Sequence, residues 1–305
     1  MTNGVDVLLL GATGQVGTEL KCQAWPAEIE IHAPGRGELD LTDENALTQL
    51  IASRKWACVI NAAAYTAVDN AETEVGVAWR MNALVPALLA SMTARGQTPI
   101  VHVSTDYVFD GQSQKPYQPH DPVRPQSVYG ASKEGGEQAV RTANPRHVIV
   151  RTAWVVSPHR ANFVKTILRL AAERDVLHVV DDQRGCPTSA SDLASALMRI
   201  SLRQVADASA PCGTYHFVNA GDTTWCGFAR EIMAGAGRRG ARAVPVDAIA
   251  TSDYKTPARR PANSALSTET LARDYDICPR PWQQALDDIL DILLAPEQRS
   301  GEGSA

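Results

Sequence analysis

The chain has 305 residues, 44% hydrophobic and 21% charged, a globular composition with room for one large α/β domain and a smaller one. The net charge of -5 gives no support to nucleic-acid binding, which usually needs a clustered basic surface. No apolar run approaches the roughly 18 residues of a membrane span, and the N-terminus lacks the basic flank and cleavage site of a signal peptide. We therefore expect a cytoplasmic protein that binds neither nucleic acid nor membrane.

In the first half of the chain, short apolar runs alternate with longer amphipathic ones. The apolar runs predict strands buried on both faces, at 5–10, 29–32, 58–62, 100–104 and 148–151. The amphipathic runs predict helices at about 15–24, 43–53, 70–94 and 127–143. Thr42 or Asp43 is a suitable N-cap for the second helix, and Gly96 a suitable stop for the third. This alternation predicts an α/β fold with a doubly wound parallel sheet.

After about residue 154 the alternation becomes less regular. The sequence predicts a helix near 161–174, a strand at 176–180, a helix near 189–203 and a strand at 214–219. We expect residues 1–154 to form a dinucleotide-binding domain to which segments near 186–218 return. Residues 155–296 are expected to form mainly a smaller substrate-binding domain, and the polar residues 297–305 a flexible tail.

The sequence GATGQVG at 11–17 directly follows the first strand and opens the first helix. In this spacing Gly11 permits a tight turn, Gly14 lets the backbone approach a pyrophosphate, and Gly17 allows the helix to pack closely on the strand. The pyrophosphate would lie at the helix N-terminus, where free N–H groups favour negative charge. The alternative is a glycine-rich turn without a ligand, but the strand–loop–helix setting favours a dinucleotide site. Its other cofactor-facing members are expected to be Thr13, Gln15 and Val16.

The segment HAPGRGELDLTD at 32–43 bears on the choice between NAD and NADP. No acidic residue stands at the strand end to bind the ribose 2′-hydroxyl, whereas Arg36 is placed to meet a 2′-phosphate. The alternative is that Arg36 is a solvated loop cation. We expect NADPH as the cofactor, with NADH possible, and Asp40 and Leu41 beside the adenine.

Tyr129 and Lys133 form a Y-x-x-x-K pattern at the start of a predicted helix, and the spacing places both side chains on one face. A tyrosine that donates a proton to a developing alkoxide needs a lowered pKa, and a neighbouring ammonium lowers it by stabilising the phenolate. The same lysine can hold the hydroxyls of the nicotinamide ribose. The pattern alone is weak, because such pairs are common on helix surfaces.

Upstream of this pair, the fourth predicted strand runs into VSTDYVFDG at 103–111. Hydroxyls at the carboxyl end of a parallel strand face the crevice where ligands bind. Thr105 is the candidate hydroxyl for a substrate carbonyl, with Ser104 as the alternate, and Asp106 is expected to touch the substrate. A strand-end residue that caps the backbone is the alternative for Thr105. The glycine loop, Thr105 and the Y-x-x-x-K pair in this order predict a nicotinamide-dependent reductase.

No motif points to a different chemistry. The sequence has no G-x-S-x-G nucleophile elbow, no C-x-x-C pair and no histidines at metal-ligand spacing. We therefore predict no metal, and cysteines that are buried or incidental thiols.

These motifs resemble the extended short-chain dehydrogenases, and within them the dTDP-4-dehydrorhamnose reductases, over nearly the whole chain. YTAVDNAE at 65–72 and DQRGCPT at 182–188 are typical of this subfamily, whereas the glycine loop and Y-x-x-x-K are typical only of the superfamily. The resemblance implies a Rossmann-like fold with a smaller C-terminal substrate-binding domain. It also implies NADPH-dependent reduction of the C4 keto group of dTDP-4-dehydro-L-rhamnose to dTDP-L-rhamnose.

Carried onto matching positions, the resemblance implies a catalytic trio of Thr105, Tyr129 and Lys133, with Tyr129 as general acid. The residues implied to line the cofactor after the third strand are Ala62, Ala63 and Tyr65. The residues implied at the substrate are Thr66, Val68, Asp69, Trp154, Asn162, Phe163, Arg184 and Asn263.

Arginines in the second half of the chain suit a diphosphate, because a guanidinium clamps such groups through paired hydrogen bonds. Arg184 and either Arg259 or Arg260 are the candidates, and a solvated loop arginine is the alternative for each. For Trp154 the alternative to a platform for the sugar is packing in the core.

Some relatives in this family bind magnesium through acidic residues at a dimer interface. The matching positions here hold Gln15 and, near the second one, Ser191, neither of which is charged. We therefore expect no structural metal, and either a monomer or a weak homodimer.

Three alternatives to this function remain open from the sequence. The first is a neighbouring enzyme, either a 4-ketoreductase for another nucleotide-deoxysugar or an epimerase. The second is a non-catalytic regulatory subunit resembling that of methionine adenosyltransferase, which the intact Thr105, Tyr129 and Lys133 disfavour. The third is a transcriptional regulator on a reductase fold, which the acidic net charge disfavours.

Overall fold

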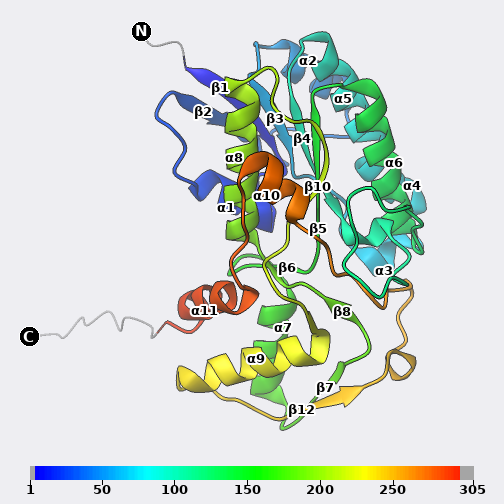
Figure 1. Cartoon of the computed structure of the whole chain (residues 1–305), viewed down its shortest axis with the longest axis vertical. Helices are drawn as coiled ribbons and strands as arrows, with labels where there is room; N and C mark the ends of the chain where they lie inside the picture. Colours follow the sequence, from blue (N-terminus) through cyan, green and yellow to red (C-terminus); the bar gives the residue numbers. More distant parts are fainter. Residues whose placement is uncertain (1–3, 296–305) are drawn as a thin grey trace, which may run out of the picture.

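A computed structural model describes residues 4–295, and its centre is a six-stranded sheet with the strand order β10-β5-β4-β3-β1-β2 (Figure 1). All five pairings within the sheet are parallel. The strands are β1 (Val5–Leu10), β2 (Ile29–His32), β3 (Cys58–Asn61), β4 (Ile100–Thr105), β5 (His147–Thr152) and β10 (Gly213–His216). The expectation of a Rossmann-like doubly wound sheet is confirmed.

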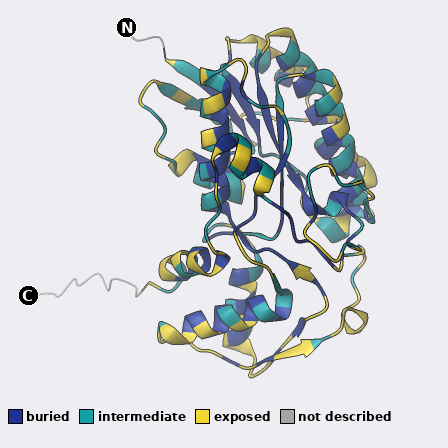
Figure 2. Ribbon diagram, in the orientation of Figure 1, coloured by how far each residue is buried: buried dark blue, intermediate teal, exposed yellow. Residues whose placement is uncertain are grey.

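The sheet is covered by helices on both faces, and its inner strands β1, β3, β4 and β5 are accordingly largely buried (Figure 2). Because successive side chains of a strand point to opposite faces, Val7 and Leu9 of β1 join one core cluster and Leu8 and Leu10 join another. The first cluster takes side chains from α1 (Gln15–Cys22), α8 (Ala190–Ala206) and α10 (Glu269–Tyr275). The second takes them from α2 (Glu44–Ala52), α5 (Val85–Arg95) and α6 (Val128–Ala143). The apolar run from Val7 to Leu10 of β1 suits this double cover.

The long helix expected at 70–94 is instead a series of shorter pieces. They are α3 (Val68–Ala71), α4 (Val75–Trp79), the π-helical turn η1 (Arg80–Leu84) and α5. Pro86 in the first turn of α5 has no N–H to bond back to residue 82, so the regular α pattern is interrupted ahead of it. The prediction that the strand at 29–32 is buried on both faces was also wrong. The residues of β2 are intermediate or exposed because it is the edge strand of the sheet.

The run Val75–Arg95 is long and apolar enough, by length and composition, to cross a membrane. That test is weak here, because core helices of soluble proteins pass it too. Val85, Leu89 and Ala90 of this run lie in the second core cluster, and α5 packs along α6.

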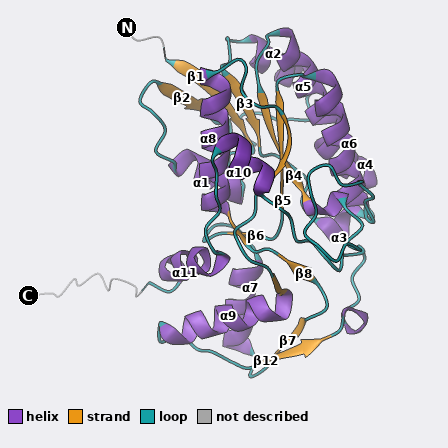
Figure 3. Ribbon diagram, in the orientation of Figure 1, coloured by secondary structure: helices purple, strands orange, loops and turns teal. Residues whose placement is uncertain are grey.

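A second region holds its own apolar cluster below the sheet (Figure 3). Its helices are α7 (Phe163–Glu173), α9 (Trp225–Arg238) and α11 (Trp282–Leu293), and its parallel strand pair is β7 (Leu177–Val180) with β12 (Val246–Ile249). Two-residue strands complete it as pairs, β6 (Val155–Val156) with β9 (Thr188–Ser189), and β8 (Arg184–Gly185) with β11 (Thr223–Thr224). Single 3-10 turns occur at η2 (Asp106–Val108) and η3 (Thr251–Asp253).

The chain passes more than once between the sheet and this second region. After β9 it returns through α8, which packs on α1, to β10 at the edge of the sheet. It leaves again through α9 and comes back once more through α10. The expected division near residue 154 stays a prediction, and the tail expected at 297–305 lies outside the described residues.

The strand order reverses beside β1, since β2 lies on one side of it and β3, β4 and β5 follow on the other. Loops leaving β1 and β3 at such a point diverge to opposite faces and open a crevice at the carboxyl ends of the strands. Gly11 follows β1 and Ala62 follows β3 at this point.

Candidate active site

Two adjoining cavities, of about 920 Å³ and 720 Å³, open along the carboxyl ends of the strands. They share a set of lining residues: Thr13, Gly14, Arg36, Ala62 and Ala64. The glycine loop therefore lies where the two cavities meet. A ligand with two arms joined at its centre, such as a dinucleotide, fits this arrangement.

The geometry of the glycine loop fits the pyrophosphate of such a ligand. Gly11 has a φ of +84°, a conformation that side chains disfavour. A Cβ on Gly17 would lie 2.1 Å from the carbonyl oxygen of Gly11, so only glycine lets α1 pack so close. Gly14 is the N-cap of α1 and provides no side-chain cap, which leaves the first N–H groups of the helix for a ligand.

The first cavity collects the residues expected at the adenosine end. Arg36, Asp40, Leu41, Ala63 and Tyr65 all line it, together with Gly11.

Two of these side chains already have partners. Asp40 accepts hydrogen bonds from the backbone N–H and hydroxyl of Thr42, which lower the pKa of its carboxyl. The Tyr65 hydroxyl donates to Glu74 at 2.6 Å, which raises the pKa of Tyr65. Tyr65 therefore contributes to this wall through its ring and backbone, because its hydroxyl is engaged outside.

The second cavity collects the proposed reactive residues. Thr105 comes from the end of β4, and Tyr129 and Lys133 come from the first turns of α6. Ser127 caps α6 by accepting a hydrogen bond from the N–H of Gly130. A Cβ on Gly130 would lie 2.2 Å from the Tyr107 carbonyl oxygen, so glycine at this position lets the helix start closely against the chain that follows β4.

A buried ion pair fixes α6 against the sheet. Arg151 of β5 donates from Nε and Nη2 to the two carboxylate oxygens of Glu137, at 2.9 and 2.7 Å. Both side chains are almost fully buried. Glu137 is one helical turn beyond Lys133, so the pair holds the segment that carries the Y-x-x-x-K residues.

The ionisation of Tyr129 differs from the expectation. Burial raises the pKa of Tyr129 to about 12, with Thr105 acting in the opposite direction. Lys133 is itself desolvated, since its Nζ donates to the Val103 carbonyl at 2.7 Å and burial lowers the pKa of Lys133 to about 8. The desolvation of both groups outweighs the expected stabilisation of the phenolate.

Asp106 lies directly beside Thr105 and is buried. Its carboxylate accepts hydrogen bonds from the hydroxyls of Thr105 (2.9 Å) and Ser264. Burial raises the pKa of Asp106 to about 6, against the lowering effect of these two hydrogen bonds. Asp106 thus orients Thr105 and also ties the residues after β4 to the loop near 264.

Six of the residues expected at the substrate line the second cavity: Thr66, Val68, Thr105, Asp106, Trp154 and Asn162. The Trp154 ring stacks on Trp225 with a centroid distance of 3.5 Å. Beneath it lies Gly185, where a Cβ would come within 2.4 Å of the indole. Trp154 therefore packs against an aromatic neighbour and also borders the cavity, and its role as a platform for the sugar stays a prediction.

The other four expected substrate residues do not line this cavity. Asp69 is paired with Arg260, Phe163 packs among Trp225 and Phe228, and exposed Arg184 pairs with Asp222. Asn263 is buried, and its amide donates to the backbone carbonyls of Ser113 and Lys115. The polar residues among these four bind partners that are distant in the sequence, which no local pattern reveals. Arg184 and Asn263 lie near a third cavity of about 670 Å³, which is lined in part by Cys186, Asp222 and Ser113.

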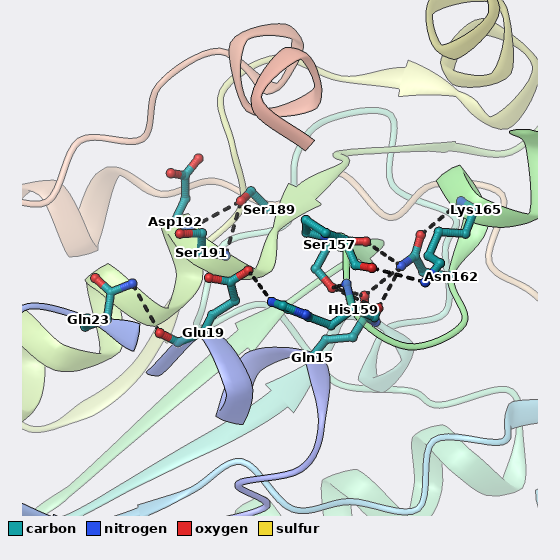
Figure 4. A network of polar contacts seen from close by, with 11 residues as sticks. Gln15, Glu19, Gln23, Ser157, His159, Asn162, Lys165, Ser189, Ser191 and Asp192 are labelled. Carbon is teal, nitrogen blue, oxygen red and sulfur yellow. Dashed lines mark hydrogen bonds and ion pairs between the residues drawn. The ribbon is translucent and has the colours of Figure 1, made fainter. Parts of the chain in front are cut away.

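The positions linked to magnesium in relatives serve other purposes here (Figure 4). The Gln15 side-chain oxygen accepts hydrogen bonds from Ser157 Oγ at 2.7 Å and Asn162 Nδ2 at 3.1 Å. Ser191 donates its backbone N–H to the hydroxyl of Ser189, the N-cap of α8. Neither position offers a carboxylate, and the absence of a structural metal stays a prediction.

Several residues of these cavities were not expected from the sequence. They are Arg80 in the first cavity and Tyr107, Thr152 and Arg160 in the second. Arg160 gave no signal, because it follows the β6 strand in a segment without a motif. Tyr107 stands next to Thr105 and Asp106, so its position at a strand end was a usable signal.

Comparisons with known proteins place this geometry in a family. The model of the RmlD substrate binding domain matches residues 5–295. The dTDP-4-dehydrorhamnose reductase of Sinorhizobium fredii is 41% identical over 285 residues, which cover 93% of this chain and 96% of that protein. The solved structure of dTDP-4-dehydrorhamnose reductase from Clostridium acetobutylicum has a TM-score of 0.88 at 36% identity and covers 94% of this chain and 99% of that one.

A second solved structure, dTDP-4-dehydrorhamnose reductase from Bacillus anthracis in complex with NADP, has a TM-score of 0.86 at 32% identity. It covers 94% of this chain and 99% of that chain. The resemblance expected from the motifs is confirmed, and the chain belongs to the RmlD substrate binding domain family.

Proposed function

We propose that this chain reduces the C4 keto group of dTDP-4-dehydro-L-rhamnose, with NADPH, to give dTDP-L-rhamnose. The observation that supports this most is the joining of two cavities at the glycine loop, with Thr105, Tyr129 and Lys133 lining the second one. Membership of an oxidoreductase family and the NADP in the Bacillus anthracis relative agree with this chemistry.

The cofactor would lie with its adenosine in the first cavity and its nicotinamide in the second. Arg36 stands at the junction of the two, and Arg80 lines the adenosine side. These cations suit a 2′-phosphate, which an acidic residue at the end of β2 would repel. When bound, NADPH supplies the hydride that adds to C4 of the sugar.

Tyr129 is the proposed general acid. As hydride adds to C4, the C4–O4 double bond becomes a single bond, and O4 takes the phenolic proton of Tyr129. The raised pKa leaves Tyr129 protonated at neutral pH, so it holds the proton that O4 takes, although the same shift makes the transfer of that proton less favourable. Thr105 would donate a hydrogen bond to the same oxygen when its single hydroxyl proton turns from Asp106 to the substrate.

Lys133 is the proposed ligand of the nicotinamide ribose. Its only hydrogen bond within the described residues is to the Val103 carbonyl, and an ammonium has three N–H donors. Two donors therefore remain for ribose hydroxyls or for the Tyr129 oxygen. The positive charge near Tyr129 would also stabilise the phenolate that remains after proton transfer.

The test is the oxidation of NADPH, followed by its nicotinamide absorbance, with enzymatically generated dTDP-4-dehydro-L-rhamnose. We expect rapid, substrate-dependent loss of NADPH and a slower reaction with NADH. A second nucleotide-linked 4-ketosugar serves as the control for substrate identity. If that sugar is turned over faster, the chain is a reductase for a different deoxysugar.

Two outcomes would contradict reduction altogether. An epimerase retains its dinucleotide through the cycle, so stoichiometric cofactor in the purified protein, without net consumption of NADPH, would favour that reaction. Binding of NADPH without turnover of either sugar would favour the non-catalytic regulatory role.

A further inference from the structure

Arg160 links the second region of the molecule to the glycine loop. It lies in the segment 157–162, between β6 and α7, and its Nε donates to the carbonyl oxygen of Thr13 at 2.8 Å. Arg160 also lines the second cavity, along with Thr13, Gly14 and Arg36. One of its N–H groups therefore contacts the loop itself, at the point where the two cavities meet.

The segment that carries Arg160 is anchored on α1 by three further contacts, whose residues Figure 4 labels. Ser157 and Asn162 both donate to the Gln15 side-chain oxygen. His159 lies 3.3 Å from the Glu19 carboxylate. These contacts flank Arg160 on both sides in the sequence, so its backbone is held in place against the glycine loop.

The conformation of Arg160 itself is unusual. Its φ is +56°, in the left-handed region where glycine is far better accommodated than arginine. An arginine at a neighbouring position of the segment would not have this unfavourable backbone conformation. The strained position therefore suggests that the Arg160 side chain has a function.

The remaining donors of Arg160 have no protein partner among the described residues. A guanidinium has five N–H donors in a planar fork that matches phosphate oxygens, and only the Nε–H is engaged here. Arg36 lines both the first and the second cavity, so a second cation lies where the two cavities meet. The group that lies there in the proposed complex is the doubly charged pyrophosphate.

We propose that Arg160 binds the pyrophosphate of the dinucleotide and so lets the second region of the chain contribute to cofactor binding. This inference rests on the proposed function for the identity of the dinucleotide. The diphosphate of the sugar nucleotide is a different source of the same chemistry. The hydrogen bond to Thr13, within the glycine loop, favours the cofactor.

The variant Arg160→Gly removes the guanidinium and suits the left-handed backbone. A loss of affinity in this variant therefore cannot come from added backbone strain. Arg160→Lys keeps the charge without the planar fork. Arg169→Ala is the matched control, because Arg169 is an exposed arginine on α7 whose one ion-pair partner among residues 4–295 is Glu173. Dissociation constants for NADPH, NADH, 2′-AMP and dTDP are measured by calorimetry, without any need for turnover.

We expect Arg160→Gly to raise the dissociation constants of NADPH and NADH by the same factor, about 10-fold or more. The dissociation constant of 2′-AMP should be unchanged, because this ligand has no pyrophosphate. Arg160→Lys should fall between this variant and the wild type. Arg36→Ala should instead weaken the binding of NADPH and 2′-AMP more than the binding of NADH. The midpoint of thermal unfolding of Arg160→Gly should not fall.

Unchanged NADPH and NADH affinities in Arg160→Gly would overturn the proposal. A loss confined to dTDP would assign Arg160 to the sugar nucleotide instead, and a loss confined to NADPH would assign it to the 2′-phosphate. Failure of the reductase assay alone would leave these binding results intact, so the two proposals fail separately.

Discussion

Arg260 contacts both carboxylate oxygens of Asp69, with Nη1 3.1 Å from Oδ1 and Nη2 2.8 Å from Oδ2. The backbone N–H of Ala258 donates to the same Oδ1. These contacts join α3, which follows β3, to the loop that precedes α10. The pair lowers the pKa of Asp69, so both groups stay charged at neutral pH.

The first prediction concerns this pair. Arg260→Ala is expected to raise the KM for the sugar nucleotide about 10-fold, because it removes the half-buried cation and releases the loop at residue 258. The affinity for NADPH should be unchanged. Arg259→Ala is the control, since in the part of the chain that the structure describes the Arg259 side chain makes a single long hydrogen bond, to Gln126 at 3.4 Å. Equal effects of the two substitutions on KM would exclude a specific role for Arg260.

The second prediction concerns Tyr129. Tyr129→Phe should lower kcat at least about 10²-fold, the usual contribution of a general acid, while the Kd for NADPH stays nearly unchanged. Tyr107→Phe is the matched control, because its ring packs edge to face on Tyr129 at a centroid distance of 5.4 Å. Turnover at the wild-type rate in Tyr129→Phe would show that another group supplies the proton.

The third prediction concerns the pH dependence of stability. Burial lowers the pKa of Lys133 to about 8, from the ordinary lysine value of 10.5. Between these values the unfolded chain binds a proton that the folded chain does not, so this residue makes the free energy of unfolding rise with pH. Urea unfolding at pH 7 and pH 9.5 should show a smaller rise in Lys133→Met than in the wild type. Identical pH dependence in the two proteins would mean that Lys133 is charged across this range.

The fourth prediction concerns Gly185. Gly185→Ala places a methyl group against the Trp154 indole, which cannot retreat freely because it stacks on Trp225. Overpacking of this kind typically costs about 1–3 kcal/mol of stability. We also expect altered tryptophan fluorescence and a higher KM for the sugar nucleotide. Gly37→Ala is the control, since no atom lies within 4 Å of a Cβ there.

Unchanged fluorescence and KM in Gly185→Ala would mean that Trp154 does not border the bound sugar. A stability loss without any change in KM would leave Trp154 a packing residue only.

The fold was largely predictable because its signals are local. Each of the strands at 5–10, 100–104 and 148–151 is a short apolar run that lies under helices on both faces. The break at η1 was missed, because Pro86 suits the first turn of a helix as well as an interruption. The two-residue strands β6, β8, β9 and β11 are too short to show any periodicity.

The cofactor half of the candidate site was predictable for the same reason, since each residue follows a strand or starts a helix. The substrate half was less so, because the partners of Asp69 and Arg184 come from distant parts of the chain. The raised pKa of Tyr129 was also beyond local patterns. It depends on how much water the folded chain excludes, which spacing along one helix does not reveal.

The contacts of Gln15 with Ser157 and Asn162 have a consequence for the cost of ligand binding. They hold the segment 157–162 against the glycine loop before any dinucleotide arrives. A preorganised wall loses little conformational entropy when the ligand binds, so more of the interaction energy is expressed as affinity. A hydrogen-bonded glutamine thus ties the second region of the chain to the cofactor site before the ligand binds.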